Sequence, residues 1–210
     1  MLKFRNSIII FLILLSEAVF ASSKIYLIRH AEVQIKNPGW CNTKETQSYK
    51  EEYNIAHVRN FNPEIVLEKI DNPELIGTVF CSPQSRAIET AGLLFDKQVA
   101  LKINENLMEL DYSVVRIPVI KLPVKAWQTI SRISWMAGVN RKDKPTLKQR
   151  KQSLEEYTSE LITFAEKHGE SVVIAHGAVN RELIKILKKK GWKLEEKDGF
   201  GNLSVNCLIK

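Results

Sequence analysis

Ile25-Tyr26-Leu27-Ile28-Arg29-His30-Ala31-Glu32 is the stretch that decides the fold. Its first four residues are apolar and favour β structure, and such an unbroken run is typical of a parallel strand covered by helices on both faces. Arg29 and His30 follow the run directly, so we expect them at the carboxyl end of the strand. Ligands of open α/β sheets bind beside that edge. The stretch therefore predicts a central strand with a functional site at its end.

Arg29 and His30 carry side chains that suit phosphate chemistry. A guanidinium group binds phosphate oxygens through two parallel hydrogen bonds, and a neutral imidazole is available as a nitrogen nucleophile near pH 7. A histidine after a strand is also often a structural residue that is held by hydrogen bonds. These two residues alone leave both interpretations open.

The same pattern recurs near the C-terminus, where Ser171-Val172-Val173-Ile174-Ala175-His176-Gly177 places an apolar strand before a second histidine. Between the two stretches, Gly77–Cys81 is expected as a buried strand and Gln84–Phe95 as a helix. We expect Ser82 to cap that helix. Arg86 then lies in its first turn, where a helix N-terminus and a guanidinium group together attract an anion. Two histidines and two arginines are thus expected at one edge of one sheet.

The remaining elements complete an α/β three-layer sandwich with a mainly parallel central sheet. Apolar patterns predict helices over residues 63–70, 124–136 and 147–167 and strands over residues 99–103 and 204–209. Residues 33–60 are polar and are interpreted as a long irregular loop, in which Trp40 either stacks on a substrate or anchors the loop to the core. Residues 194–197 are left unassigned.

The segment from about residue 114 to 148 is basic and broken by turns, and we expect it to form a lid-like insertion that lies over the sheet. Its basic residues would form either a solvated face or a receiving surface for an anionic substrate. These residues are Lys121, Lys125, Arg132, Arg141 and Lys142.

The composition indicates the class of the protein. A chain of 210 residues without internal repeats or low-complexity segments is enough for one sizeable domain. The net charge of +7 suggests an anionic partner, but the basic residues are scattered among acidic ones. The sequence has no zinc-ligand spacing, RNP-like motif or basic helix-turn-helix, so nucleic acid is not expected as a partner. A small anionic substrate accounts for the charge.

The first 21 residues have the three parts of a secretory signal peptide. The start is basic, residues 7–15 are apolar, and Val19-Phe20-Ala21 ends in a small residue suited to cleavage. Glu17 interrupts the apolar segment before it reaches the roughly 20 residues that a spanning helix needs. We therefore expect cleavage after Ala21, export to the periplasm or the exterior, and no stable membrane insertion of residues 22–210. An uncleaved signal anchor is the alternative.

Three cysteines, Cys41, Cys81 and Cys207, leave the redox state open. In an oxidising compartment one disulfide bond is possible, but the sequence does not pair them. Cys81 and Cys207 lie in apolar runs and are expected as small core residues.

Taken together, these motifs resemble the histidine phosphatase superfamily, which includes cofactor-dependent phosphoglycerate mutases and many phosphatases. The Arg-His-Gly motif of that family is similar to Arg29-His30-Ala31, with alanine in place of glycine. The family's Ser-Pro-x-x-Arg-Ala-x-x-Thr-Ala pattern is matched throughout by residues 82–91, and its second histidine with glycine by His176-Gly177. The resemblance runs from Lys24 to the C-terminus and implies a phosphoglycerate mutase-like fold.

The resemblance also implies roles for individual residues. His30 would be the nucleophile that becomes phosphorylated. Glu109, in a Leu-x-Glu segment, would donate the proton that an alkoxide leaving group requires. The glycine and second acidic residue that often follow in the family are absent here, and Asp111 is a nearby competitor for this role. No metal and no cofactor are expected, because cationic groups stabilise the phosphoryl group. The residues expected to bind the phosphoryl oxygens are Arg29, Arg86 and His176.

The function implied is an exported phosphatase that hydrolyses a small phosphomonoester. A phosphoglycerate mutase-type phosphotransferase is one alternative, although it needs a phosphohistidine protected from water and an intracellular pool of sugar phosphates. A catalytically silent phosphate-binding module is another, and it applies if Glu109 is misplaced. A polyanion-binding surface protein is the last, and it would show a steep salt dependence.

Overall fold

The computed structural model describes residues 22–95, 99–117, 119–139 and 144–210. The predicted signal peptide, with its expected cleavage after Ala21, lies outside these residues, as do Arg141 and Lys142. Within the described part of the chain, no helix is both long enough and apolar enough to cross a membrane.

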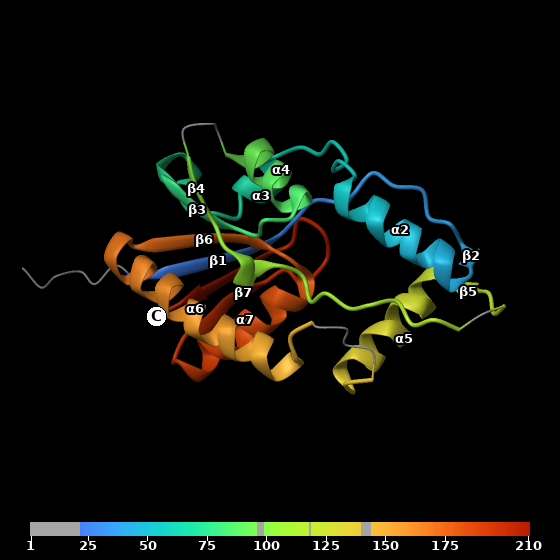
Figure 1. Ribbon diagram of the computed structural model, residues 1–210. Helices are drawn as coiled ribbons and strands as arrows, with labels where there is room; N and C mark the ends of the chain where they lie inside the picture. The colour runs from blue at the N-terminus through green and yellow to red at the C-terminus, as the bar shows by residue number, and fades with distance from the viewer. Residues whose placement is uncertain (1–21, 96–98, 118, 140–143) are drawn as a thin grey trace, which may run out of the picture.

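A six-stranded sheet in the order β4-β3-β6-β1-β8-β7 forms the centre of the fold. β1 (Lys24–Arg29) pairs in parallel with β6 (Glu170–Ala175). The parallel part of the sheet continues through β3 (Thr78–Cys81) to β4 (Ala100–Ile103). The mainly parallel central sheet expected from the sequence is confirmed (Figure 1).

β8 (Val205–Ile209) and β7 (Lys193–Lys197) complete the sheet as antiparallel strands on the other side of β1. The C-terminal strand agrees with the prediction. β7 is not predicted from the sequence, because Lys-Leu-Glu-Glu-Lys has no run of alternating apolar residues. Charged side chains are typical of an edge strand, where they discourage pairing with another sheet.

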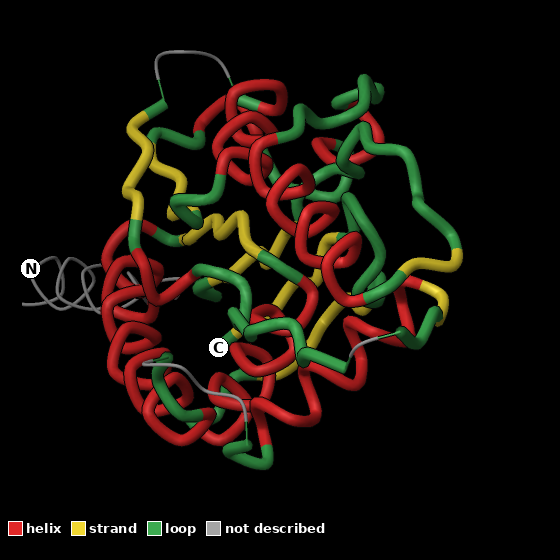
Figure 2. The backbone as a smooth tube through the Cα atoms, turned by 45° about the vertical axis from the view of Figure 1, so that its right-hand side comes forward, coloured by secondary structure: helices red, strands yellow, loops and turns green. Residues whose placement is uncertain are grey.

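Helices cover both faces of the sheet and give the predicted three-layer sandwich. α3 (Glu64–Leu67) and α4 (Ser85–Leu94) lie above the sheet in Figure 1, and α6 (Leu147–His168) and α7 (Gly177–Lys189) lie below it. In the tube view of Figure 2 the strands run between the helices. Each of the expected helices 63–70, 84–95 and 147–167 is therefore present, the first of them shortened to a single turn.

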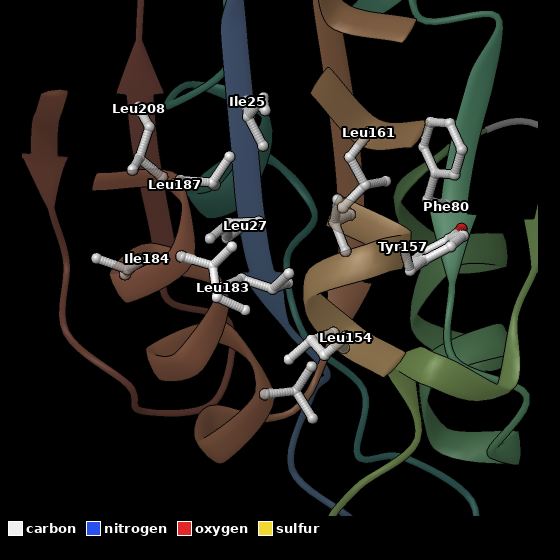
Figure 3. Packing of buried hydrophobic residues seen from close by; sticks show 14 of the residues in the cluster. Ile25, Leu27, Phe80, Leu154, Tyr157, Leu161, Leu183, Ile184, Leu187 and Leu208 are labelled. Carbon is white, nitrogen blue, oxygen red and sulfur yellow. The ribbon is translucent and has the colours of Figure 1, made fainter. Parts of the chain in front are cut away.

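The side chains of β1 alternate between the two faces, as those of any strand do. Ile25 and Leu27 belong to the buried cluster between the sheet and helices α6 and α7, part of which Figure 3 shows. Tyr26 and Ile28 belong to the cluster on the opposite face, between the sheet and helices α3 and α4. All four side chains are buried, so the central strand is fixed from both sides and its carboxyl end has a defined position.

The segment between β1 and α3 contains a helix that the sequence analysis misses. α2 (Thr43–Ile55) occupies a large part of residues 33–60, so the prediction of a long irregular loop is wrong there. Only Thr46 of this helix is buried, so the apolar spacing that identifies a helix is lacking. The capping box formed by Asn42 and Glu45 is the signal that could have found it.

α5 (Val124–Met136) confirms the helix expected in the basic insertion. It packs against α2, and the two helices lie together at the right of Figure 1, where α2 also contacts α4. A short ladder between β2 (Trp40–Cys41) and β5 (Leu122–Pro123) joins the insertion to the segment before α2. The insertion and α2 therefore form one unit beside the sheet.

The three cysteines are buried free thiols, so the possible disulfide bond is not formed. Cys81 and Cys207 are core residues, as predicted, and Cys41 packs with Val124 and Trp127. Burial raises the pKa of the Cys81 thiol to about 12. A thiol with so high a pKa is a poor nucleophile near neutral pH.

Candidate active site

The carboxyl ends of β1, β3 and β6 bring the predicted residues together. His30 follows β1, His176 follows β6, and Arg86 lies in the first turn of α4, after β3. The centroids of the two imidazole rings are 4.9 Å apart, and Arg86 Nε donates a hydrogen bond to His30 Nε2 over 3.3 Å. All three side chains are buried. Two histidines and a guanidinium group therefore form one cluster at the predicted edge of the sheet.

The hydrogen bonds of His30 determine which ring nitrogen carries its proton. Nδ1 lies 2.7 Å from the backbone oxygen of Ala31, which can only accept, so Nδ1 is the donor. Nε2 faces the N–H of Arg86, which can only donate, so Nε2 is the acceptor and is unprotonated. An unprotonated Nε2 is what a nitrogen nucleophile requires, although Arg86 occupies its lone pair in this structure.

His30 is also held in its neutral form. Burial lowers the pKa of His30 from 6.5 to about 3. The positive charges of Arg86 and Arg29 act in the same direction, against the hydrogen bond to Ala31. An imidazole that is neutral throughout the physiological range can attack phosphorus without first losing a proton.

The low pKa of His30 makes a prediction about acid stability. The unfolded chain binds a proton on His30 near pH 6.5 and the folded chain only near pH 3, so the free energy of unfolding falls as the pH falls between these values. Between pH 6.5 and 5 this residue accounts for up to about 2 kcal/mol, or about 4–8 °C of melting temperature. We expect the His30→Asn protein to lose that part of the acid destabilisation in thermal melts from pH 7 to 5.

The control for this experiment is His57→Asn, because the His57 side chain is largely exposed. Its melting temperature is expected to follow the wild-type dependence on pH. If the His30→Asn protein loses as much stability in acid as the wild type, His30 is not buried as a neutral ring.

His176 is oriented by Ser82. The Ser82 hydroxyl lies 2.9 Å from His176 Nε2 and accepts a hydrogen bond from the backbone N–H of Gln84. The hydroxyl can donate its proton to Nε2, and in that arrangement the ring proton of His176 lies on Nδ1. Nδ1 is buried and has no hydrogen-bond partner among the described residues. A neutral donor next to His30 is therefore available for a phosphoryl oxygen.

His176 is uncharged for the same physical reasons as His30. Burial is the largest cause, and the neighbouring His30, Arg86 and Arg29 act in the same direction, so the pKa of His176 lies well below its ordinary value. A neutral ring can contact an anion only as a hydrogen-bond donor, so the positive charge of the cluster lies on the two arginines.

The expected role of Ser82 as a helix cap is wrong. α4 begins at Ser85, and its N-cap residue is Gln84, which makes no side-chain capping bond. Ser82 contacts His176 instead, while Gln84 Oε1 accepts a hydrogen bond from the backbone N–H of Glu109 over 3.0 Å. The loop before α4 thus connects the second histidine to the candidate acid.

Arg29 is positioned by Phe200 and Gly177. Its Nη1 donates to the backbone oxygen of Phe200 over 2.5 Å. A Cβ atom added at Gly177 would lie 3.2 Å from that oxygen and 3.6 Å from Cδ and Nη1 of Arg29. The tight contact is the one with the Phe200 oxygen, so a side chain at residue 177 would press on the backbone oxygen that holds Arg29.

We expect the Gly177→Ala protein to bind phosphomonoesters more weakly. The added methyl group presses on the Phe200 oxygen that positions Arg29, and a shift of Arg29 that loses one charge-assisted hydrogen bond of about 1.5 kcal/mol to the substrate raises KM about 10-fold. Steady-state kinetics and a thermal melt of the same protein measure this. The control is Gly92→Ala in α4, where a Cβ atom has no neighbour within 4 Å, and its KM is expected to stay at the wild-type value. An unchanged KM in Gly177→Ala would contradict this role of the glycine.

α2 completes the surroundings of Arg86. Arg86 Nη1 donates to Asn54 Oδ1 over 3.3 Å, and its guanidinium carbon lies 5.0 Å from the centre of the Tyr53 ring. Thr90 Oγ1 donates to the backbone oxygen of Arg86 and accepts from the backbone N–H of Ala31. Sequence reasoning misses Tyr53 and Asn54, because it assigns no helix to their segment.

Glu109 and Asp111 have different surroundings, although both face the same cavity. Lys50 and Lys144 both bind the Asp111 carboxylate, the first over 2.6 Å. Burial opposes ionisation of Asp111, but hydrogen bonds from Lys144 and Lys50 outweigh it and hold the pKa of Asp111 below its ordinary value. The Glu109 carboxylate has no ion-pair partner in the described part of the chain and accepts a hydrogen bond from the N–H of Leu110 over 3.2 Å. Glu109 is therefore better placed than Asp111 to hold a transferable proton.

A cavity of about 490 Å³ adjoins these groups. Arg29, Arg86 and Glu109 contribute to its lining. Trp40 does not line it and is 69% exposed, so Trp40 neither faces this site nor anchors a loop in the core. No group of three or more His, Cys, Asp or Glu that could hold a metal ion occurs among the described residues. α2 and α5 supply further lining residues of the cavity. These are Tyr49, Lys50, Tyr53 and Asn54 from α2 and Lys125, Gln128 and Arg132 from α5.

The profile of the histidine phosphatase superfamily (branch 1) matches residues 25–209. An ecdysone phosphate phosphatase from Bombix mori, solved with tungstate, has a TM-score of 0.54 at 15% identity, with 88% of each chain covered. It shares the fold.

Two further solved structures match less closely. A mycobacterial glucosyl-3-phosphoglycerate phosphatase has a TM-score of 0.49 at 14% identity, with 89% of each chain covered. A phosphoserine phosphatase from Entamoeba histolytica has a TM-score of 0.48 at 17% identity, with 88% of this chain and 89% of that chain covered. A search of curated proteins finds no match.

Proposed function

The chain belongs to the histidine phosphatase superfamily (branch 1), and on this premise we propose that it hydrolyses a phosphomonoester through a phosphohistidine at His30. One observation carries the proposal: His30 Nε2 is a buried, unprotonated nitrogen in contact with Arg86 and beside His176. Such a nucleophile, surrounded by donors for oxygen atoms, suits the transfer of a dianionic phosphoryl group.

In the first step, His30 Nε2 attacks phosphorus in line with the bond to the leaving oxygen. The P–N bond forms as the P–O bond breaks, and Glu109 gives its proton to the departing oxygen. Since Arg86 Nε occupies the Nε2 lone pair in the free protein, this hydrogen bond must pass to a phosphoryl oxygen before the attack. Binding of the phosphoryl group therefore frees the nucleophile.

In the second step, water attacks the phosphorus of the phosphohistidine. Glu109, now a carboxylate, accepts a proton from the water, and the electron pair of the P–N bond returns to His30 Nε2. Inorganic phosphate leaves, and the starting state of both residues is restored.

Arg29, Arg86 and His176 stabilise the transferring phosphoryl group during both steps. In many phosphoryl-transfer enzymes a bound metal ion neutralises this charge. Two guanidinium groups can take over that role, so we propose that the reaction is independent of metal ions.

Hydrolysis of p-nitrophenyl phosphate in excess EDTA tests the proposed function. A panel of phosphorylated sugars and acids, assayed by release of phosphate, begins to define the substrate. We expect turnover that EDTA leaves unchanged. Transfer to an added sugar phosphate instead of water would favour a mutase, and tight phosphate binding without turnover would favour a silent binding module.

We propose in addition that the protein is exported. The basic start, the short apolar segment and Val19-Phe20-Ala21 support cleavage after Ala21. Expression of the full chain in a bacterial host, followed by mass determination of the periplasmic product, measures this. The proposal requires a product that starts at Ser22, and an intact chain in the membrane fraction would favour the uncleaved signal anchor.

A further inference from the structure

The cavity next to the nucleophile carries more positive charge than one phosphoryl group requires. Its described lining includes five cationic side chains but only two acidic ones, Glu109 and Asp111. A bound phosphomonoester adds two negative charges, and the proposed mechanism needs Glu109 protonated while it binds. The cavity then still has an excess of positive charge. The cationic residues are Arg29, Lys50, Arg86, Lys125 and Arg132.

Part of this excess lies on one face of α5. Lys125, Gln128 and Arg132 follow each other at helical spacing and all line the cavity. The helix is anchored in the protein, because Trp127 and Trp135 are buried and Trp127 Nε1 donates to the backbone oxygen of Cys41 over 2.7 Å. The helix thus presents a fixed polar face to the substrate.

Arg132 is the best defined group on this face. Its guanidinium carbon lies 5.4 Å from the centre of the buried Tyr112 ring, a distance that suits a cation–π contact. Its Nε is buried and has no hydrogen-bond partner among the described residues. A buried donor without a partner is unfavourable, so this atom favours binding of an acceptor.

The nearby carboxylates do not neutralise Arg132. Asp111 is bound by Lys50 and Lys144. Glu109 has no ion pair with any described residue, and the proposed reaction needs it as an acid. The other two arginines lie beside the nucleophile: Arg29 donates to Phe200, and Arg86 donates to His30 and Asn54. Arg132 and Lys125 are therefore free to bind a group other than the one that is transferred.

We propose that the leaving group of the substrate carries a second anionic group, a carboxylate or a further phosphate, and that Arg132 and Lys125 bind it. This inference rests on the proposed function and narrows its substrate class. The phosphoryl group that reacts is bound by Arg29, Arg86 and His176, and the second anion lies against α5. Arg132 and Lys125 thereby determine specificity, and they take no part in the bond changes.

A pair of matched compounds tests this inference. 4-(Carboxymethyl)phenyl phosphate and 4-(carbamoylmethyl)phenyl phosphate differ in one charge, and the methylene group insulates the leaving phenolate from it. We expect the wild-type protein to have at least about 10-fold higher kcat/KM for the acid, since a charged hydrogen bond contributes roughly 1.5 kcal/mol or more. Arg132→Met should remove most of this preference and leave the amide within about threefold, and Arg132→Lys should restore part of it.

Lys188→Met is the control for net charge, because Lys188 is exposed at the end of α7, outside the cavity lining. It is expected to keep the wild-type preference. Equal loss for both compounds in Arg132→Met, or hydrolysis of both without preference, would overturn the inference and leave the proposed function standing.

Calorimetric binding of the same two compounds separates the two proposals. If neither compound is hydrolysed but the acid still binds at least tenfold more tightly through Arg132, the second-anion site is supported and the proposed hydrolysis fails. Equal affinities for acid and amide would overturn the second-anion site whatever the rate of hydrolysis.

Discussion

Replacing His30 with alanine is expected to abolish turnover of p-nitrophenyl phosphate, with kcat reduced by at least about 10⁴-fold, the order of effect seen when a covalent nucleophile is removed. The buried, unprotonated Nε2 is the atom that accepts phosphorus, and the other phosphate ligands cannot replace it. Binding of inorganic phosphate should persist, because Arg29, Arg86 and His176 remain. Steady-state assays and calorimetry measure the two quantities.

His168→Ala is the control for this change, since His168 is exposed at the end of α6 and lies outside the cavity lining. It should retain wild-type turnover. Residual activity of the His30→Ala protein within tenfold of the wild type would show that phosphorus is attacked by another group, or directly by water.

The second large effect is expected for Glu109→Gln, which should lower kcat/KM for an alkyl phosphate by about 10²–10⁴-fold. An alkoxide leaves only with a proton, and glutamine cannot supply it. The loss of kcat/KM, which reports the attack by His30, should be smaller for p-nitrophenyl phosphate, because nitrophenolate leaves without protonation. In contrast, kcat should fall for both substrates, because Glu109 is also the base of the second step. Assays of glycerol phosphate and p-nitrophenyl phosphate with the same protein measure the difference.

Asp111→Asn is the matched comparison. Asp111 is held as a carboxylate by Lys50 and Lys144, so we expect the asparagine variant to keep kcat within about tenfold on both substrates. If Asp111→Asn shows the large loss and Glu109→Gln does not, the acid is Asp111 and the assignment from the Leu-x-Glu segment is wrong.

The parts of the fold that the sequence predicts are those with strong apolar patterns. β1 and β6 are continuous buried runs, and in a parallel sheet their carboxyl ends meet at one edge. The proximity of His30 and His176 follows from that rule. α6 likewise shows apolar residues at helical spacing along its length.

The parts that escape prediction lack such patterns. α2 has a single fully buried residue, so its capping box is the main local signal, and Tyr53 and Asn54 on it are missed as neighbours of Arg86. Ser82 precedes a helix and is an ordinary cap candidate, but its hydroxyl binds His176, which comes from a distant part of the chain. Contacts of this kind depend on the packing of several elements and have no local signature.

The basic residues of the insertion also could not be assigned a role from the sequence. Its sequence allows a solvated face or an anion-binding face, and the packing of α5 distinguishes residues that the composition does not. Lys125 and Arg132 line the cavity, whereas Lys121 does not. Helical spacing can group Lys125 with Arg132, but only the contact with α2 decides that this face is turned toward the site.

The central claim is that phosphorus passes through His30, and trapping the intermediate tests it most directly. The wild-type protein is mixed with p-nitrophenyl phosphate, quenched in alkali within milliseconds to preserve phosphohistidine, and analysed by peptide mass spectrometry. The account predicts one phosphoryl group on His30, and none in the His30→Ala protein. A phosphoryl group on any other residue, or turnover with no phosphoprotein in the quenched sample, would contradict it.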